Sequence, residues 1–299
     1  MCRHLAYLGP RASLRSLLTD PPYSLYRQAW APRRQRYGTV NADGFGIGWY
    51  ADGDPVPARY RQGGPIWGDP SLADLARVIS SRALLAAVRS ATPGTAAGAE
   101  AAAPFGSGPW LFSHNGVAHG WRDWAARASV LEHPEHDRDT RPGAPGTGGE
   151  PSLLASLEAL VDSALLWALV LGRLRAGQDM GAALAGTITA VEAAGGTGRF
   201  NFLLTDGRAV AATACGDTLW YRRQGEAGTG PAAASARSVV VASEPFDDEP
   251  GWTEVPDRHL LTGTPHELHV RPLAAAADGA GNPTTTGTHR DAFTEGILS

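Results

Sequence analysis

The chain has 299 residues, 43% of them hydrophobic, which is enough to bury a large core in one domain or two smaller ones. With 26 basic and 30 acidic residues, its formal net charge of −4 provides no general attraction for nucleic acid or for an anionic membrane surface. The sequence contains no lysine, so all 26 basic residues are arginine.

Composition also bears on the class of protein and its compartment. The 37 glycines and 22 prolines favour a loop-rich protein over a helical bundle. Two cysteines, Cys2 and Cys215, are too few for a disulfide framework and favour a reducing compartment. The longest apolar run, residues 164–171, is far shorter than the roughly 20 residues that a bilayer requires, and the N-terminus lacks the apolar region of a signal peptide. We therefore expect a cytoplasmic protein that has neither a membrane nor a nucleic acid as partner.

The first part of the chain alternates short strands with short helices and turns. The pattern predicts a strand at 2–8, a helix at 13–18, a glycine-dotted strand at 45–50, a helix at 71–79 and a strand at 84–88. Residues 94–108 are rich in Ala and Gly and predict a loop. A strand at 110–113 then leads into His114-Asn115-Gly116, where the Asn-Gly step predicts a turn.

The second part of the chain runs from a loop through helices to strands. Residues 132–150 are polar and rich in Gly and Pro, so they predict an exposed loop. Residues 152–175 form the strongest helical pattern, long enough for one helix or two in succession, and another helix is expected at 181–192. Six strands are predicted after it, at 200–204, 209–213, 219–222, 239–242, 259–261 and 267–270. The tail at 273–299 is biased toward Ala, Gly and Thr and is expected to be disordered.

The order of strands, helices and again strands predicts an α+β fold. Hairpin-like links in both strand regions favour stacked antiparallel sheets with the helices outside. Regular alternation of strands and helices, as in a doubly wound parallel sheet, is missing. We expect one domain at residues 1–272.

Cys2 directly follows the initiator methionine. Methionine is normally removed before a residue as small as cysteine, and its removal would leave a thiol and a free α-amine on one residue. The α-amine has an ordinary pKa of about 7.7–8.0, close to ideal for a general base at neutral pH, and a thiol is already a good nucleophile. The pair therefore predicts a catalytic N-terminal cysteine, although a cysteine at position 2 also arises by chance.

The segment Ser113-His114-Asn115-Gly116 follows an apolar strand. The side-chain amide of Asn115 and the backbone N–H of Gly116 are suited to stabilise an oxyanion. An ordinary Asn-Gly hairpin turn is the alternative interpretation.

Two charged residues stand beside apolar segments. Arg89 leaves the strand expected at 84–88, where its fork of donors would suit the carboxylate of an amino acid; a surface ion pair is the alternative. Asp162 precedes the apolar residues 164–171, where its carboxylate would hold a substrate ammonium or cap a helix.

Taken together, these residues occur in the order seen in class II glutamine amidotransferase domains, which are N-terminal-nucleophile hydrolases. The resemblance is carried by MCRHLA at 1–6, NADGFGIGW at 41–49, AVRSAT at 87–92, SHNG at 113–116 and VDS at 161–163. It extends from Cys2 to about Pro272. The resemblance implies a four-layer αββα sandwich of two mainly antiparallel sheets.

Further segments resemble a narrower group, the stand-alone γ-glutamyl hydrolases of ergothioneine biosynthesis. These segments are QAWAPRRQR at 28–36, CGDTL at 215–219, ASEPFDD at 242–248 and VPDRHL at 255–260. The narrower resemblance implies hydrolysis of a γ-glutamyl amide in a small molecule.

The resemblance implies a catalytic role for three residues. Cys2 becomes the nucleophile and its freed α-amine the base. The Asn115 side chain and the Gly116 N–H become the oxyanion hole. No metal and no cofactor are implied.

Substrate binding is implied for four further residues. Arg89 would hold the α-carboxylate of the glutamyl group and Asp162 its α-ammonium. Thr92 and His114 lie beside these groups in the sequence and would shape the pocket.

Two positions depart from the family pattern. Many class II domains carry a glutamate two residues after the aspartate, whereas Asp162 and Ser163 are followed by Ala164. Pro93 follows Thr92 where amidotransferases often carry histidine.

The leaving group is the less constrained half of the substrate. No acceptor domain is visible for ammonia, which favours a free-standing hydrolase with a larger leaving group. By resemblance, that group is a hercynylcysteine sulfoxide, whose trimethylammonium an aromatic face would hold by cation–π attraction. The candidate side chains are Trp30, Trp49, Trp121 and Trp124.

Three alternatives remain open at this stage. The first is a glutaminase-type subunit that supplies ammonia to a separate synthase. The second is a metal-dependent hydrolase using His133, His136 and Asp137, a cluster without an established zinc spacing. The third is a non-catalytic binding module, for which Cys2 would be dispensable. Cys215 is expected to be a small core residue rather than a second nucleophile.

Overall fold

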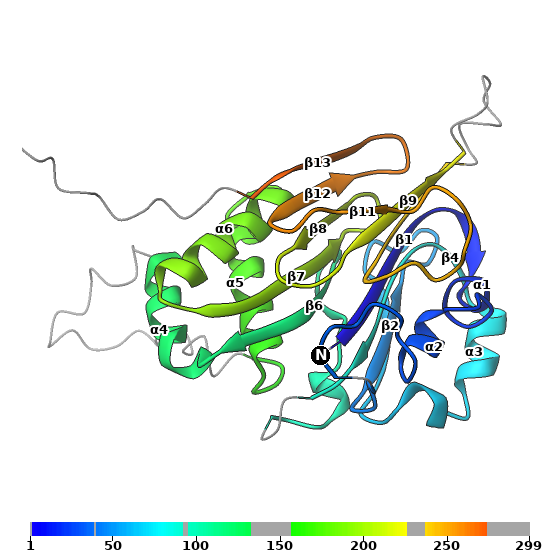
Figure 1. Ribbon diagram of the computed structural model, residues 1–299, viewed down its shortest axis with the longest axis horizontal. Helices are drawn as coiled ribbons and strands as arrows, with labels where there is room; N and C mark the ends of the chain where they lie inside the picture. Colours follow the sequence, from blue (N-terminus) through cyan, green and yellow to red (C-terminus); the bar gives the residue numbers. More distant parts are fainter. Residues whose placement is uncertain (1, 39, 92–94, 133–156, 226–236, 274–299) are drawn as a thin grey trace, which may run out of the picture.

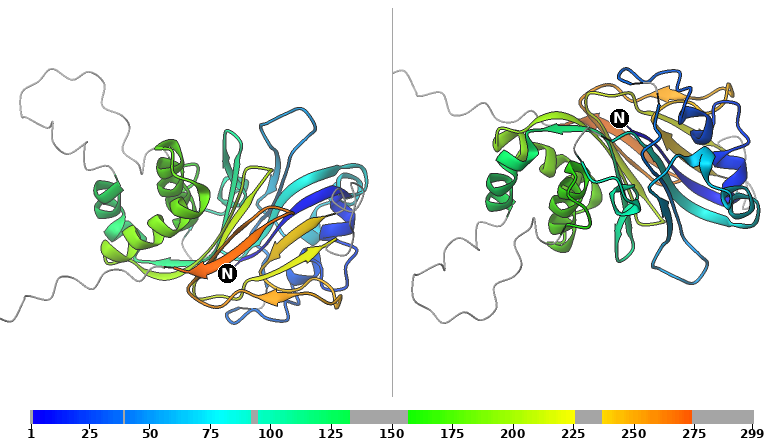
Figure 2. Two further views of the ribbon diagram at one scale, coloured as in Figure 1. Left: turned by 90° about the horizontal axis from the view of Figure 1, so that it is seen from above. Right: turned by 90° about the horizontal axis from the view of Figure 1, so that it is seen from below.

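Two antiparallel β-sheets are stacked at the centre of the molecule, and helices cover both outer faces (Figure 1). The computed structural model describes residues 2–38, 40–91, 95–132, 157–225 and 237–273. Seen from above and below, the layers follow one another as helices, sheet, sheet and helices (Figure 2). The predicted α+β class and its four-layer arrangement are therefore confirmed.

The larger sheet has seven strands and contains the N-terminus. Its strands are β1 (Cys2–Ser13), β2 (Phe45–Trp49), β3 (Ala58–Gln62), β4 (Ser80–Arg89), β9 (Trp220–Gln224), β10 (Ser238–Ala242) and β11 (Thr253–Glu254). They lie in the order β11-β9-β10-β1-β4-β2-β3. The central strand β1 is thus paired on both sides, with β4 and with β10.

The smaller sheet has six strands. They are β5 (Phe105–Ser107), β6 (Trp110–His119), β7 (Thr197–Thr205), β8 (Val210–Ala214), β12 (His259–Gly263) and β13 (Leu268–Pro272). Their order is β13-β12-β8-β7-β6-β5, and all pairs are antiparallel.

Helices form the two outer layers. They are α1 (Leu14–Leu18), α2 (Leu25–Gln28), α3 (Leu72–Val78), α4 (Trp121–Glu132), α5 (Asp162–Arg175) and α6 (Met180–Ala193), with 3₁₀ turns η1 (Ile66–Gly68) and η2 (Ala99–Ala101). The first three helices pack on the larger sheet, and α5 and α6 pack on the smaller one. Ser13 caps α1 by accepting the Ser16 N–H (3.1 Å), and Asp179 caps α6 by accepting the Ala182 N–H (2.8 Å).

Alternation along β1 divides its side chains between two cores. Leu5 packs outward with the helices of the first layer. Ala6 and Leu8 face inward and pack against the smaller sheet. Because side chains on a strand point alternately to opposite faces, Cys2 and His4 share the inward face with Ala6 and Leu8. The N-terminal cysteine is therefore directed into the space between the sheets.

Three segments differ from the sequence-based expectation. The His-Asn-Gly segment is not a turn but lies within β6, paired with β7. The loop expected at 94–108 contains η2 and the short strand β5 from residue 95 onward. The helix expected from 152 begins at Asp162 in the described residues, because Val161 is extended (φ −133°, ψ 153°) and ends the preceding non-helical segment.

Some elements lack a sequence signal. These are α2, α4, β3 and β11. β3 is an edge strand of mostly polar, exposed residues, so it has no alternating pattern, and β11 has only two residues. The expected loop beyond Glu132 and the tail beyond Leu273 lie outside the described residues, while Leu273 itself is buried in the helix-covered core.

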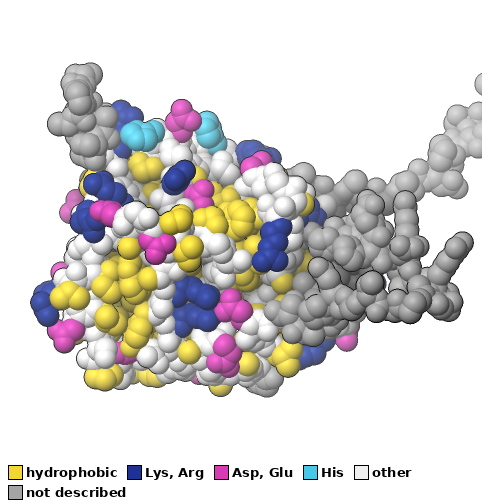
Figure 3. Space-filling model, turned by 180° about the vertical axis from the view of Figure 1, so that it is seen from behind, with side chains coloured by type: hydrophobic (Ala, Val, Ile, Leu, Met, Phe, Trp, Pro, Cys, Tyr) yellow, Lys and Arg dark blue, Asp and Glu magenta, His cyan; other side chains and the backbone are white. Residues whose placement is uncertain are grey.

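On the surface, charges of the two signs are interspersed. The face in Figure 3 shows arginine side chains next to acidic ones, with apolar groups between them. Within the described ranges, no helix is long and apolar enough to cross a membrane.

Candidate active site

The N-terminal end of β1 brings together residues from three distant parts of the chain. Cys2 pairs in register with Arg89 of β4, so the two side chains share the inward face of the larger sheet. The Cys2 N–H donates to Oδ1 of Asn115 in the smaller sheet, at 3.2 Å. Three residues predicted for one site are thus in mutual proximity.

Asn115 has an unused donor. The residue is fully buried, and its Nδ2 has no hydrogen-bond partner among the described residues. A buried donor without a partner costs about 1–3 kcal/mol, and a ligand that supplied an acceptor there would offset this cost. An oxyanion next to Cys2 would meet that requirement.

Gly116 is required by a close approach between strands. It lies opposite Phe200 in the β6–β7 pair. A Cβ on Gly116 would collide with the carbonyl oxygen of Arg199 and lie 2.6 Å from Nε2 of His114. The glycine therefore permits tight strand pairing, and this tertiary contact explains why the Asn-Gly step does not form a turn.

Arg89 is buried next to the nucleophile. Its guanidinium donates to the carbonyl oxygens of Asp43 (3.1 Å) and Ala96 (2.9 Å) and to Oγ1 of Thr95 (3.2 Å). Its partners among the described residues are all neutral oxygens, so the alternative of a surface ion pair is wrong. A buried arginine whose charge has no acidic partner is well suited to bind a carboxylate.

Asp43 orders the strand end beside Arg89. Its Oδ2 accepts the Ala91 N–H at 2.8 Å, and its backbone N–H donates to the Arg89 carbonyl at 2.9 Å. Thr92 and Pro93 follow directly and lie outside the described residues.

His4 is a buried member of the site that the sequence analysis did not single out. Its Nδ1 lies 3.2 Å from Oγ of Ser113, and Ser243 Oγ accepts its backbone N–H at 3.0 Å. Burial lowers the pKa of His4 to about 3, and the charges of Arg3 and His114 act in the same direction. His4 is therefore a neutral imidazole. Its place on the inward face could have been predicted from the sequence, because side chains alternate along a strand and His4 lies two residues after Cys2.

His114 lies on the opposite face of β6 from Asn115. Its Nε2 donates to the carbonyl oxygen of Arg199 (2.9 Å), which leaves Nδ1 to accept from Ser163 Oγ (3.0 Å). Burial lowers its pKa. The side chain thus fixes β6 against β7 and α5, and does not face the space that contains Cys2.

Asp162 is the first residue of α5, whereas Val161 occupies the N-cap position. Its Oδ2 accepts the Ala118 N–H (2.9 Å), and its Oδ1 accepts the Ser163 N–H (2.8 Å). The carboxylate is therefore tied to β6 three residues beyond Asn115 and remains partly exposed.

Comparison with known proteins identifies the family of this chain. A family model described as glutamine amidotransferases class-II matches residues 16–140. The chain is also 40% identical over 273 residues to the γ-glutamyl-hercynylcysteine sulfoxide hydrolase of Mycolicibacterium smegmatis, covering 91% of this chain and 100% of that protein. The chain belongs to the class II glutamine amidotransferases.

Solved structures of this family share the fold. A glutamine aminotransferase class-II domain protein from Silicibacter pomeroyi superimposes with a TM-score of 0.56 at 22% identity, over 92% of this chain and 100% of that one. Glutamine phosphoribosylpyrophosphate amidotransferase from B. subtilis superimposes with a TM-score of 0.55 at 14% identity, over 91% of this chain and 49% of that one.

Buried Asn201 anchors the site from the side of β7. Asn201 lies opposite Asn115, and its Oδ1 accepts the N–H groups of Cys215 (2.8 Å) and Asp217 (3.1 Å). Cys215 is 4% exposed and belongs to the helix-covered core, as expected for a packing residue. Asn201 thus fixes the turn after β8 behind the site.

The four tryptophans proposed to hold a trimethylammonium lie elsewhere. Trp30 and Trp49 pack against the outer core of the larger sheet. Trp121 and Trp124 are buried in the helix-covered core of the smaller sheet. None of them belongs to the core between the sheets, toward which Cys2 points, so their role in binding the leaving group stays a prediction that the structure does not support.

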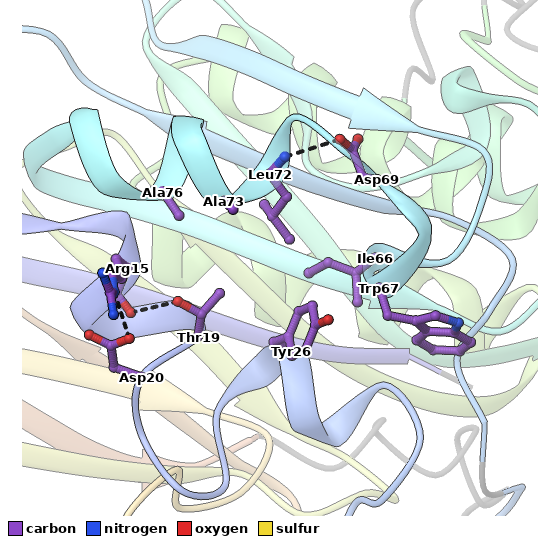
Figure 4. Close-up of a pocket in the computed structure, with 10 residues that line it drawn as sticks. All are labelled: Arg15, Thr19, Asp20, Tyr26, Ile66, Trp67, Asp69, Leu72, Ala73 and Ala76. Atoms are coloured by element: carbon purple, nitrogen blue, oxygen red, sulfur yellow. Dashed lines mark hydrogen bonds and ion pairs between the residues drawn. The ribbon is translucent and has the colours of Figure 1, made fainter.

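A hollow of about 410 Å³ lies on the outer face of the larger sheet, between α1, α2, η1 and α3 (Figure 4). Its acidic groups already have partners: Asp20 pairs with Arg15 at 2.9 Å, and Asp69 Oδ1 accepts the Leu72 N–H at 3.1 Å. Because Cys2 points to the other face of this sheet, the hollow is separate from the candidate site.

Among the described residues, no three His, Cys, Asp or Glu side chains form a cluster that could hold a metal ion. The alternative set of His133, His136 and Asp137 lies outside those residues.

Proposed function

We propose that this chain hydrolyses the γ-glutamyl amide of γ-glutamyl-hercynylcysteine sulfoxide and releases glutamate. The observation that carries the proposal is the contact between Cys2 N and Asn115 Oδ1, which sets the unpartnered Asn115 Nδ2 beside the nucleophile. The 40% identity to a hydrolase of that name supports this substrate.

In the first half-reaction, Cys2 forms a thioester with the γ-carbonyl carbon. Once Met1 has been removed, the Cys2 α-amine takes the thiol proton and the sulfur attacks the carbonyl. The oxyanion is stabilised by Asn115 Nδ2–H and the Gly116 N–H. The α-amine then gives its proton to the leaving nitrogen, and the C–N bond breaks.

In the second half-reaction, water opens the thioester. The α-amine accepts a proton from the attacking water, the same donors stabilise the second oxyanion, and the C–S bond breaks as the proton returns to sulfur. Glutamate leaves and the enzyme is regenerated.

The glutamyl group is held by charges of opposite sign. Arg89, buried and bonded only to neutral oxygens, binds the α-carboxylate. Asp162, partly exposed at the start of α5, binds the α-ammonium. His114 lies against Gly116 on the face of β6 that is opposite to Asn115. Thr92 is assigned a place beside Arg89 on its sequence position alone.

The test combines intact mass and glutamate release on the same purified sample. The wild-type protein should lack Met1 and release glutamate from the conjugate, and Cys2→Ala should lose at least about 10⁴-fold in turnover. Cys215→Ala is the matched control, because it removes the other thiol of the chain while keeping Cys2.

Different results would redirect the proposal. Ammonia from glutamine without glutamate from the conjugate would favour a glutaminase-type subunit. Full activity in Cys2→Ala would remove the N-terminal cysteine mechanism altogether.

A further inference from the structure

Cys2 has the Arg89-bearing strand β4 on one side and strand β7 of the smaller sheet on the other. In the larger sheet, β1 lies between β4, which carries Arg89, and β10; in the smaller sheet, β6 lies between β5 and β7. β4 packs on β6, whereas β1 packs on both β6 and β7. Moving from β4 across β1 therefore leads toward β7. If the glutamyl group occupies the Arg89 side, the leaving amine must occupy the β7 side.

Arg199 is the charged residue that β7 places on this side. It shares the inward face with Asn201 and lies two residues from it, about 7 Å along the strand. Asn201 in turn lies opposite Asn115. The Arg199 Nε donates to Oδ2 of Asp217 at 3.0 Å, and the Asp217 side chain is 1% exposed. Arg199 is thus held by a buried carboxylate, one inward-facing position along β7 from the Asn201–Asn115 pair.

Tyr37, in the loop between α2 and β2, covers Arg199. The guanidinium carbon of Arg199 lies 4.3 Å from the centroid of the Tyr37 ring. Tyr37 belongs to the loop at residues 33–41, whose Gln35 accepts from Arg3 Nε (3.0 Å) and donates to the Tyr37 carbonyl oxygen (2.8 Å). The Arg199–Tyr37 contact joins β7 of the smaller sheet to a loop next to the larger one. The Cys2–Asn115 bond likewise connects the two sheets.

The loop is fixed at its base while its tip is open. Glu244 is fully buried and accepts the N–H groups of Arg33 (2.9 Å) and Arg34 (2.7 Å). The Asn41 N–H donates to the Ala29 carbonyl oxygen at 2.6 Å. Tyr37 nevertheless remains 52% exposed. A large aromatic ring that is held in place but half open to solvent is a preorganised contact surface.

We propose that Tyr37 and Arg199 form the subsite for the leaving amine, and that Tyr37 selects leaving groups that carry a planar heteroaromatic ring. This inference rests on the proposed function, which supplies the γ-glutamyl group and its direction. The hercynyl group contains an imidazole ring, which stacks on the open part of the Tyr37 ring. Because one side of that ring already contacts the Arg199 cation, the flat imidazole is favoured over the trimethylammonium as its partner. A leaving group without a ring would gain nothing from this contact.

The test compares two conjugates that share the same γ-glutamyl amide and the same sulfoxide. One is γ-glutamyl-hercynylcysteine sulfoxide, and the other is γ-glutamyl-S-methylcysteine sulfoxide, which lacks the ring. Tyr37→Ala should lower the ratio of their kcat/KM values about tenfold, mainly through KM for the hercynyl conjugate. Tyr37→Phe should restore the ratio because it keeps the ring. Val40→Ala, at another exposed apolar residue of the same loop, is the control and should leave the ratio unchanged.

A binding measurement separates this proposal from the proposed function. The amine hercynylcysteine sulfoxide is titrated into Cys2→Ala by calorimetry, with and without Tyr37→Ala, after thermal unfolding has shown that both variants are folded. Affinity that falls about tenfold without Tyr37 supports the subsite even if the wild type does not cleave the conjugate. Cleavage with an unchanged ratio and unchanged affinity would overturn the subsite alone. Absence of both cleavage and binding would overturn both proposals.

Discussion

The space between the two sheets has an apolar end and a polar end, and the same four strands build both. At one end they contribute Ala6 and Leu8 from β1, Ala83 and Leu85 from β4, Leu111 from β6 and Leu203 from β7. At the other end they contribute Cys2 and His4, Arg89, Ser113 and Asn115, and Asn201 and Arg199. All four strands therefore change from apolar to polar inward-facing side chains at the same height in the sandwich.

The two ends differ in what stabilises them. The apolar end is stabilised by burial, which needs no specific partner. At the polar end every buried donor and acceptor needs a partner, because an unpaired one costs free energy. Asn115 Nδ2 and His4 Nε2 have none among the described residues. The comparison shows that the apolar end contributes stability, whereas the polar end retains unpaired hydrogen-bonding groups that a ligand can use.

Asn115→Ala should have the largest effect and should act on the polar end alone. Loss of one oxyanion donor typically lowers turnover about 10²–10³-fold. The thermal unfolding temperature should fall only modestly, since the lost Nδ2 has no partner and the single bond that is lost is the one from Cys2 N to Oδ1. Steady-state glutamate release and a thermal melt on the same sample measure both quantities. Turnover near that of the wild type would remove Asn115 from the oxyanion hole.

Leu85→Ala tests the apolar end. Leu85 is fully buried between the sheets, so its truncation should lower the free energy of unfolding by about 3 kcal/mol. The kcat of the folded fraction should stay unchanged, because Leu85 lies beside Ala6 rather than beside Cys2. Urea titration measures the stability, and Val78→Ala, at a residue 60% exposed, provides a control with little expected change. A loss of kcat without a loss of stability would contradict the division into two ends.

His4 makes stability depend on pH, an effect that is absent at neutral pH and appears only as pH falls. Its pKa is about 3 in the folded protein because it is buried, compared with about 6.5 in an unfolded chain. As pH falls below about 6.5, the unfolded state binds a proton that the folded state does not. The free energy of unfolding should therefore drop by about 1.4 kcal/mol per pH unit from this residue until pH approaches 3. Burial acts on His114 in the same direction.

Replacement of His4 isolates its contribution. His4→Gln has no titrating ring, so urea titrations between pH 7 and pH 4.5 should show a shallower decline than in the wild type. An equal slope in both proteins would mean that the decline arises from other groups.

Local patterns were sufficient to predict much of the fold. Apolar runs and alternation identified the strand that begins at Cys2 and the long helix that contains Leu165. Each of these patterns is local, because it involves residues that are close together in the sequence. The edge strand β3 was missed because its residues are polar and exposed.

The site needed information from far along the chain. The Asn115-Gly116 step was predicted as a turn, since its local chemistry favours one. Its actual partner strand begins at Thr197, and the absent Cβ of Gly116 makes room for the Arg199 carbonyl. Nothing local marks Tyr37 as a candidate, because its ring contact is with Arg199, which is far away in the sequence.

The absence of lysine gives the backbone nitrogen of Cys2 an unusual chemical status. Once Met1 has been removed, this nitrogen, 3.2 Å from Oδ1 of Asn115, becomes the sole primary aliphatic amine of the polypeptide. Reductive methylation with ¹³C-formaldehyde would then place a single NMR label on the proposed general base. Its titration would be observed without a background signal from any other residue.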